Sequence, residues 1–199
     1  MTNNIKLQEV CKQLHIPVVG TTSWPLPIEA REILQESNPC PFTAADIDER
    51  LIGTTDFMPH SAIVCLFPYH VPHEGPTNLS RYTWATDYHL VVADYLQRLV
   101  DELKTTAPDA SFSIHCDTSP LADRYMAYLA GLGFYGKNKC FINPTWGSYI
   151  VIGTVLTTLE FESNTPIADT CMGCNRCITS CLGQCLDGNA FNYATCKSY

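Results

Sequence analysis

The stretch Ser61–Phe67, with the sequence SAIVCLF, gives the clearest structural signal in this chain. It is rich in apolar residues and shows no polar alternation, which is typical of a strand that is covered on both faces. Pro68 follows at once and ends the run. We therefore predict a central strand here, with the rest of the fold arranged around it.

Outward from this strand, apolar residues recur at helical spacing from about Asp87 to Leu103 and predict an amphipathic helix. Similar reasoning predicts helices over 7–14, 28–35 and 120–130, strands over 18–20, 111–116 and 149–159, and an irregular connection from 36 to Pro59. The mixture indicates an α+β core over 1–165. A linker within 164–169 is expected to join it to a cysteine-rich module over 166–199.

Length and composition fit one main domain, since 199 residues with 46% hydrophobic content can bury a sizeable core. No segment approaches the roughly 20 apolar residues of a membrane span, and the N-terminus does not resemble a signal peptide. We expect a cytoplasmic protein with no membrane partner. The net charge of −8 gives no general attraction to nucleic acid, so any RNA contact requires a local surface unlike the average.

Eleven cysteines, six of them after residue 170, are the main chemical feature of the chain. Their odd number, without a signal peptide, argues against a disulfide scaffold. The spacing Cys171-x2-Cys174-x2-Cys177-x3-Cys181 matches the bacterial ferredoxin run, so we predict that these thiolates bind a 4Fe–4S cluster. The five remaining cysteines are expected to be structural residues among apolar neighbours: Cys11, Cys40, Cys65, Cys116 and Cys140.

Two other interpretations of the cysteine run remain open, a structural zinc site and a redox disulfide, although both fit the spacing less well. Structural zinc usually pairs one cysteine hairpin with a distant second one, and no distant CxxC or HxxxH is present. A redox disulfide needs fewer cysteines than this run contains.

The run departs from the ferredoxin pattern at Leu182, where proline is usual, and at the additional Cys185. With Cys196 the module offers six thiols, so it binds one cluster or lacks ligands that lie beyond Tyr199.

Three glycines, Gly131, Gly133 and Gly136, fit the G-x-G-x-x-G pattern of dinucleotide-binding sites. That pattern requires a strand before the glycines and a helix after them, whereas here a helix is predicted before and a loop after. A glycine at the end of a helix, followed by a tight turn, is the better interpretation.

Short polar and glycine-bearing stretches are spread over most of the chain. They are Ser80-Arg-Tyr82, Asp87-Tyr-His89, Asp117-Thr-Ser-Pro120, Ala130–Asn138, Ile142-Asn-Pro144, Gly147-Ser-Tyr149 and the cysteine run. In this order they resemble the epoxyqueuosine reductase family of cobalamin-dependent iron–sulfur enzymes. The resemblance implies a nitroreductase-like core that binds cobalamin, a ferredoxin-like module with 4Fe–4S clusters, a low-potential electron donor, and reduction of epoxyqueuosine to queuosine in tRNA.

The resemblance also implies which residues hold the cofactors, since glycines permit close approach of the backbone to a corrin ring. The residues implied beside cobalamin are His89, Gly131, Gly133, Gly136, Lys137, Asn138 and Ser148. The cluster ligands implied are Cys171, Cys174, Cys177, Cys181 and Cys196.

Opening an epoxide requires a proton on the departing oxygen, which a carboxylic acid with a raised pKa can supply. By the resemblance, Asp117 is the expected general acid and Asp87 is the second candidate. Both could instead be helix N-caps, Asp117 before the helix at Pro120 and Asp87 before its own helix. Tyr82 and Trp84 are interpreted as core aromatics.

A second hypothesis of another class is an electron-transfer or corrinoid-binding paralogue without tRNA activity. Family enzymes carry a second cysteine motif beyond the point that corresponds to Tyr199, and longer members add a helical repeat domain that helps to hold tRNA. A corrinoid bound together with iron and sulfide favours the enzyme over a simple electron carrier.

Overall fold

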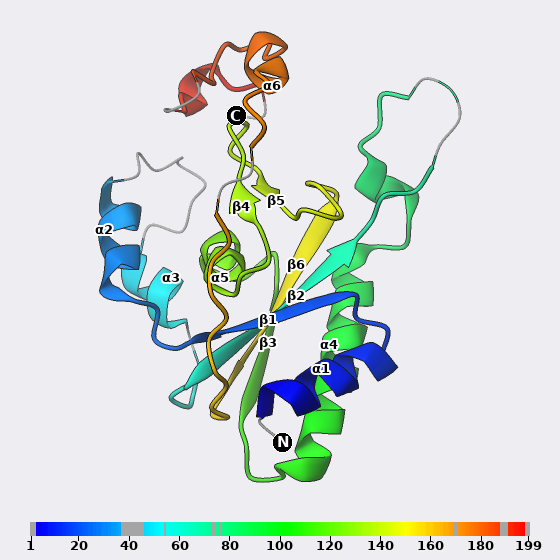
Figure 1. Ribbon diagram of the computed structural model, residues 1–199, viewed down its shortest axis with the longest axis vertical. Helices are drawn as coiled ribbons and strands as arrows, with labels where there is room; N and C mark the ends of the chain where they lie inside the picture. The colour runs from blue at the N-terminus through cyan, green and yellow to red at the C-terminus, as the bar shows by residue number, and fades with distance from the viewer. Residues whose placement is uncertain are drawn as a thin grey trace.

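A four-stranded antiparallel sheet lies at the centre of the computed structural model, which describes residues 3–36, 46–53, 55–72, 75, 77–168, 171–187 and 191–197 (Figure 1). Its strands run in the order β1 (Val18–Ser23), β2 (Ser61–Pro68), β6 (Ile150–Thr157) and β3 (Phe112–Cys116). The predicted central strand is confirmed, because β2 pairs with β1 along one edge and with β6 along the other.

Burial on both faces explains why β2 has no polar alternation. Ala62, Val64 and Leu66 belong to one hydrophobic cluster, and Ile63 and Cys65 belong to the other. All five side chains are fully buried. Because successive residues of a strand point to opposite faces, a strand between two cores must be apolar at every position.

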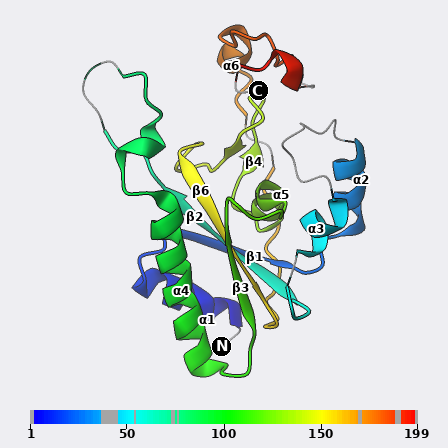
Figure 2. The same cartoon turned by 180° about the vertical axis from the view of Figure 1, so that it is seen from behind.

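Helices cover both faces of the sheet, as the opposite views in Figures 1 and 2 show. Helices α1 (Asn3–Gln13) and α4 (Tyr88–Thr106) pack on one face, and α2 (Ile28–Glu36), α3 (Ile47–Ile52) and α5 (Asp123–Leu129) pack on the other. The α+β class is confirmed. None of the helices in the described part of the chain is long and apolar enough to cross a membrane.

Short elements account for the differences from the sequence prediction. The connection predicted before Pro59 contains α3, which Asp46 caps by accepting hydrogen bonds from two backbone N–H groups. The helix predicted over 120–130 begins only at Asp123. The loop after α5 contains a hairpin of β4 (Phe134–Tyr135) and β5 (Phe141–Ile142). Elements of two to seven residues are too short for a clear hydrophobic period.

Asn164, the first residue of the segment predicted as a linker, and Ser163 before it are both fixed along β1. Asn164 Oδ1 accepts a hydrogen bond from the backbone N–H of Thr21 at 2.7 Å, and the N–H of Asn164 donates to the C=O of Thr21 at 2.9 Å. Ser163 Oγ accepts from the N–H of Ser23 at 2.8 Å. The chain therefore leaves the sheet from a fixed point, while the domain boundary at 165 stays a prediction.

Replacing Asn164 with alanine is expected to lower the free energy of unfolding by about 1–3 kcal/mol, because a buried backbone N–H loses its acceptor. Thr21, which carries that N–H, is 1% exposed. Urea unfolding followed by circular dichroism measures the change. Asn164→Asp keeps an oxygen at the same position and is the matched control. Equal losses in both variants would contradict the role assigned to Oδ1.

The cysteine module lies at the end of the molecule opposite the N-terminus (Figure 1, orange to red). It contains α6 (Arg176–Thr179) and the short 3-10 helix η2 (Tyr193–Thr195). Lys137, in the β4–β5 hairpin, donates a hydrogen bond from Nζ to Asn175 Oδ1 at 3.0 Å. A polar contact thus joins the hairpin of the core to the module.

Candidate active site

Asp117 lies immediately after β3, in a tight turn. Its φ is 57°, in the left-handed region, and the N–H of Thr118 donates to the C=O of Cys116 at 2.6 Å across it. Few residues other than glycine tolerate this region, although aspartate and asparagine do so better than most. Strained turns of this kind concentrate at functional sites, so the backbone itself marks Asp117 as a candidate.

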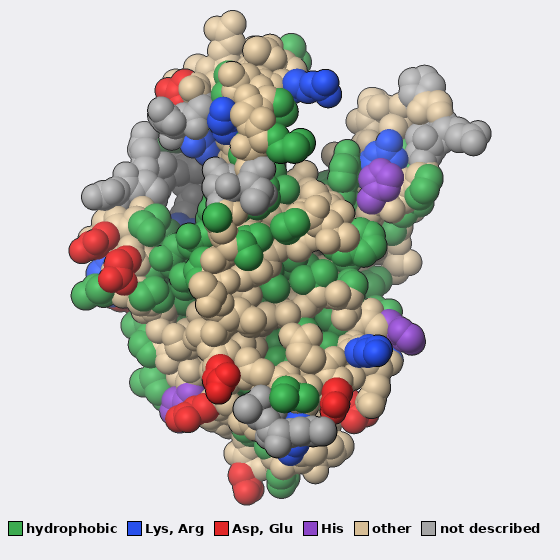
Figure 3. All heavy atoms as spheres, in the orientation of Figure 1, with side chains coloured by type: hydrophobic (Ala, Val, Ile, Leu, Met, Phe, Trp, Pro, Cys, Tyr) green, Lys and Arg blue, Asp and Glu red, His purple; other side chains and the backbone are tan. Residues whose placement is uncertain are grey.

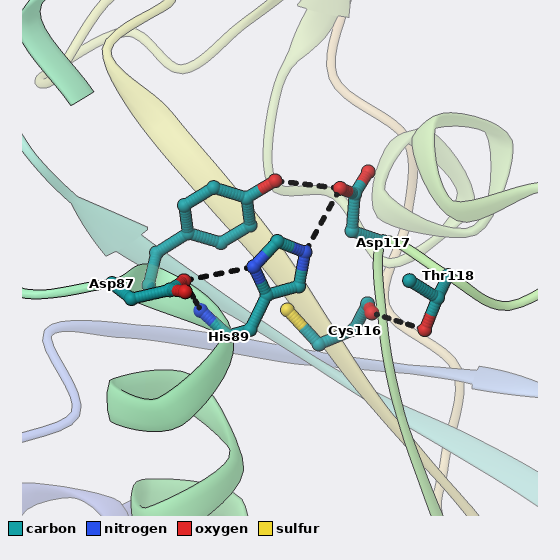
Figure 4. A network of polar contacts seen from close by, with 6 residues as sticks. Asp87, His89, Cys116, Asp117 and Thr118 are labelled. Carbon is teal, nitrogen blue, oxygen red and sulfur yellow. Dashed lines mark hydrogen bonds and ion pairs between the residues drawn. The ribbon is translucent and has the colours of Figure 1, made fainter. Parts of the chain in front are cut away.

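The carboxylate of Asp117 belongs to a polar network at the start of α4 (Figure 4). Tyr88 donates its hydroxyl to Asp117 Oδ2 at 2.6 Å, and His89 Nε2 lies 3.3 Å from the same oxygen. The other ring nitrogen, His89 Nδ1, lies 2.8 Å from Asp87 Oδ1. The imidazole bridges two carboxylates, and the structure therefore brings together Asp117, Asp87 and His89, three of the predicted site residues.

Hydrogen bonds within this network shift the proton affinities of its members. Backbone and side-chain hydrogen bonds from His89 lower the pKa of Asp87. The side-chain bond to Asp87 raises the pKa of His89, and Asp117 acts in the same direction. Burial and the hydrogen bond to Asp117 raise the pKa of Tyr88, so this phenol keeps its proton and serves as a donor.

The two aspartates differ in their relation to helix ends. Asp87 is the N-cap of α4, with Oδ1 accepting a hydrogen bond from the N–H of His89 at 2.9 Å, so the cap interpretation is confirmed there. The same interpretation is wrong for Asp117, because α5 has Ala122 as its N-cap. The loop before α5 is longer than predicted and leaves the Asp117 carboxylate available to Tyr88 and His89.

Asp117 and Tyr88 line a cavity of about 650 Å³, within the usual size of small-molecule sites. Tyr82, in the 3-10 helix η1 (Arg81–Trp84), also lines it and is 46% exposed, so its interpretation as a core aromatic is wrong. Edge-to-face contacts join Tyr82 to Tyr69 and to Tyr88, with ring centroids 6.4 and 6.0 Å apart. The cavity thus has an aromatic wall beside the carboxylate.

Sequence reasoning missed three charged residues of this cavity, namely Arg50 of α3 and the adjacent pair Asp123 and Arg124 of α5. Burial is the main cause that lowers the pKa of Arg50, and the neighbouring charge of Arg124 lowers it further. Arg124 Nη1 donates to the carbonyl of Lys139 at 2.9 Å, which ties α5 to the hairpin. Asp123 and Arg124 could have been suspected from their nearness to Asp117. Arg50 could not, because its helix has no clear sequence signal.

Contacts within the chain account for the three glycines predicted to lie beside a corrin. Gly131, with φ of 69°, follows α5 as expected of a glycine that ends a helix, and a Cβ there would lie 2.6 Å from the carbonyl oxygen of Thr165. A Cβ at Gly133 would collide with the carbonyl of Ile142, and one at Gly136 with the Ile142 side chain. None of these three described glycines lines the cavity. Their role beside a corrin stays a prediction.

The remaining residues predicted beside the cofactor also lie outside the cavity wall. Asn138 Oδ1 accepts a hydrogen bond from the N–H of Cys140 at 3.1 Å and shapes the hairpin turn. Ser148 is exposed and follows the turn at Gly147, where φ is 62°. Lys137 reaches the cysteine module, as described above, and so connects the predicted cobalamin loop with the predicted cluster ligands.

The predicted cluster ligands all lie in the cysteine module, where Cys174 is exposed and the other four are partly exposed. Cys181 Sγ is 3.3 Å from Cys185 Sγ, and Cys196 interacts with Cys185 as well. Within the described ranges, no three His, Cys, Asp or Glu side chains are placed to hold a metal ion. The donor set and its spacing fit an iron–sulfur cluster, and the thiols must draw together to bind one.

The four described cysteines among those predicted to be structural divide into three groups. Cys11 and Cys65 are buried in the core, as expected. Cys116 is half-buried beside Asp117, and burial raises its pKa to about 11, which keeps the thiol protonated. Cys140 is exposed, so its expected place among apolar neighbours is wrong. Cys40 lies outside the described residues.

Comparison with protein families finds a match over the part of the chain that carries the polar network. Residues 57–118, which include β2, all of α4 and the network residues Asp87, Tyr88, His89 and Asp117, match the family described as epoxyqueuosine reductase QueG, DUF1730. The epoxyqueuosine reductase of Bacillus cereus is 38% identical over 120 residues, and that of Listeria monocytogenes is 36% identical over 121 residues. Each match covers 60% of this chain and 32% of the relative, so the shared part is about a third of the relatives' length.

Solved structures extend the similarity over nearly the whole chain. The epoxyqueuosine reductase of Streptococcus thermophilus matches with a TM-score of 0.84 and 26% identity, over 100% of this chain and 57% of that one. An epoxyqueuosine reductase solved with an epoxyqueuosine-modified tRNA stem loop matches with a TM-score of 0.82 and 27% identity, over 97% of this chain and 55% of that one. A catabolic reductive dehalogenase, with a TM-score of 0.64 and 14% identity, shares the fold alone. The chain is therefore a partial-length relative of the epoxyqueuosine reductases.

Proposed function

We propose that this chain is the catalytic part of a cobalamin-dependent iron–sulfur reductase that converts epoxyqueuosine to queuosine in tRNA. The observation that carries the proposal is the placement of Asp117, in a strained turn on the wall of a cavity and held by Tyr88 and His89. The matched family and the relatives with this activity support the substrate.

In the proposed reaction, Asp117 protonates the epoxide oxygen as it departs. Tyr88 and His89 orient the carboxyl group by hydrogen bonds to Oδ2, and Asp87 holds the imidazole from its other side. The aromatic wall formed by Tyr69, Tyr82 and Tyr88 offers surfaces on which a nucleobase can stack. The arrangement suits a substrate that presents its modified base to a cavity.

Cobalamin and 4Fe–4S clusters are the proposed cofactors. The cavity of about 650 Å³ is smaller than a whole cobalamin, so its apolar and aromatic walls could meet only part of this cofactor, while the cysteine module fits clusters in its ligand chemistry. When bound, cobalamin would supply a strongly reducing cobalt centre, and the clusters would pass single electrons to it from a low-potential donor. The residues proposed to hold the clusters are Cys171, Cys174, Cys177, Cys181 and Cys196.

The distribution of charge is compatible with tRNA at one end of the molecule. In Figure 3, most of the visible acidic side chains lie over the left and lower parts, whereas Lys and Arg side chains appear around the cysteine module at the top. Lys137 and Arg176 belong to this region. On the face shown, the charge is unevenly spread, and a phosphate backbone would meet a more favourable surface near the module than over the lower part.

A direct test uses the protein purified without oxygen and supplied with iron, sulfide, cobalamin and a strong reductant. It is incubated with tRNA that carries epoxyqueuosine, the tRNA is then digested to nucleosides, and their masses are measured by mass spectrometry. We expect a product lighter by one oxygen atom. Iron and sulfide without corrinoid binding or product would favour the electron-transfer paralogue, and one zinc ion without sulfide would refute the iron–sulfur assignment.

A further inference from the structure

A second carboxyl group lies in the cavity, outside the network around Asp117. Asp123, the first residue of α5, is partly buried and lines the same cavity. Its Oδ1 is 3.5 Å from the hydroxyl of Thr154, a fully buried residue of β6. The position is built by two elements of the core and does not depend on the turn that carries Asp117.

The surroundings of Asp123 favour a proton on it near neutral pH. Burial raises its pKa to about 7 and the charge of Asp117 adds to the rise, while the Thr154 hydrogen bond and the two arginines oppose it. The titratable and charged groups around it are Arg50, Arg124, Asp117 and Cys116, with Tyr135 beside the arginines. A carboxyl group that titrates near 7 can take up and release protons under working conditions.

The proposed reaction needs more protons than Asp117 can hold. Removal of an epoxide oxygen breaks both C–O bonds, forms a C=C bond and releases water. The balance requires two electrons, which the low-potential donor supplies, and two protons. One carboxyl group holds one proton at a time, so a second source, either solvent or another protein group, must supply the other proton within each turnover.

We propose that Asp123 is this second source and that it returns a proton to the Asp117 carboxylate after the first transfer. The inference rests on the proposed function. Both carboxyl groups open onto one cavity, where a bridging water can connect groups that do not touch. Asp123 therefore acts on the substrate only through Asp117, by supplying a proton to its carboxylate.

Carbon-13 NMR of protein labelled at its aspartate carboxyl carbons tests the protonation without any turnover. We expect one carboxyl signal with a midpoint near 7, absent from Asp123→Asn and retained in Asp109→Asn, a substitution in the exposed turn before β3. Asparagine keeps the size of the side chain and an oxygen for Thr154. The proposal would be overturned if Asp123→Asn kept every carboxyl signal of the wild type, or if all aspartates titrated in the acidic range.

The pH profile of the loaded enzyme tests the role in the reaction. Wild-type turnover is expected to fall as the pH rises through about 7, because Asp123 loses its proton. Asp123→Asn is expected to be about 10- to 100-fold slower at lower pH, without this fall and with unchanged KM, and Asp123→Glu to regain the pH dependence. An inactive wild type would refute the proposed function. An active wild type whose profile survives in Asp123→Asn would refute the role of Asp123 alone.

Discussion

Replacing Asp117 with asparagine is expected to slow the conversion of epoxyqueuosine by about 10²- to 10⁴-fold, the range that general acid catalysis contributes. The amide has the same size and can still accept the hydrogen bond from Tyr88, but it has no acidic proton to give. Asparagine also tolerates the φ of 57° at this position, so the turn and the cofactor content should persist. Single-turnover rates on modified tRNA, with iron and cobalt content measured on the same samples, test the expectation.

Asp109→Asn is the matched control for this variant. Asp109 lies in the exposed turn that precedes β3, at the opposite end of the strand that leads to Asp117, so the same chemical change is made away from the cavity. Its rate should equal that of the wild type. A wild-type rate in Asp117→Asn would show that another group protonates the oxygen, and the assignment of the general acid would be wrong.

The core elements were predictable because their hydrophobic patterns are long. A helix of the core is apolar on one side, and a strand between two cores is apolar throughout. The run Ser61–Phe67 has no polar position because it lies between two cores, and the helix predicted over 87–103 buries Leu96, Leu99 and Leu103 on one side. Short elements leave no such pattern. The helix at Ile47–Ile52 forms through its local Asp46 cap and through packing of Leu51 in the core, and only the packing depends on contacts with distant residues.

The candidate site was only partly predictable, for a related physical reason. Asp117, Asp87 and His89 occur in short stretches that carry the family resemblance, and the structure brings them together. Their partner Tyr88 acts through a hydrogen bond across 29 positions of sequence, which no local pattern reveals. Gly131 is required at its position by close contact with the carbonyl of Thr165, which the motif does not reveal, and its role beside a corrin stays a prediction.

Replacing Cys174 with serine is expected to lower the bound iron and acid-labile sulfide by more than about tenfold if the module holds one cluster, because serine does not replace a cluster thiolate. The thiol is exposed and follows Gly173, whose φ of 70° and N–H bond to the C=O of Cys171 at 2.8 Å form a turn between Cys171 and Cys174. Cys140→Ser is the matched control, since Cys140 is also exposed but lies in the hairpin of the core. Metal and sulfide analysis of both variants, prepared without oxygen, gives the result.

The size of the loss distinguishes how many clusters the module holds. Cys174 belongs to the group with Cys171 and Cys177, whereas Cys181 and Cys196 both lie close to the additional thiol of Cys185. A second cluster held by that other group would survive in Cys174→Ser, so the iron would fall by about half. Unchanged iron in Cys174→Ser, or an equal loss in Cys140→Ser, would contradict the ligand assignment. Unchanged iron in Cys174→Ser would instead point to the thiols of Cys181, Cys185 and Cys196 as the place where the iron binds.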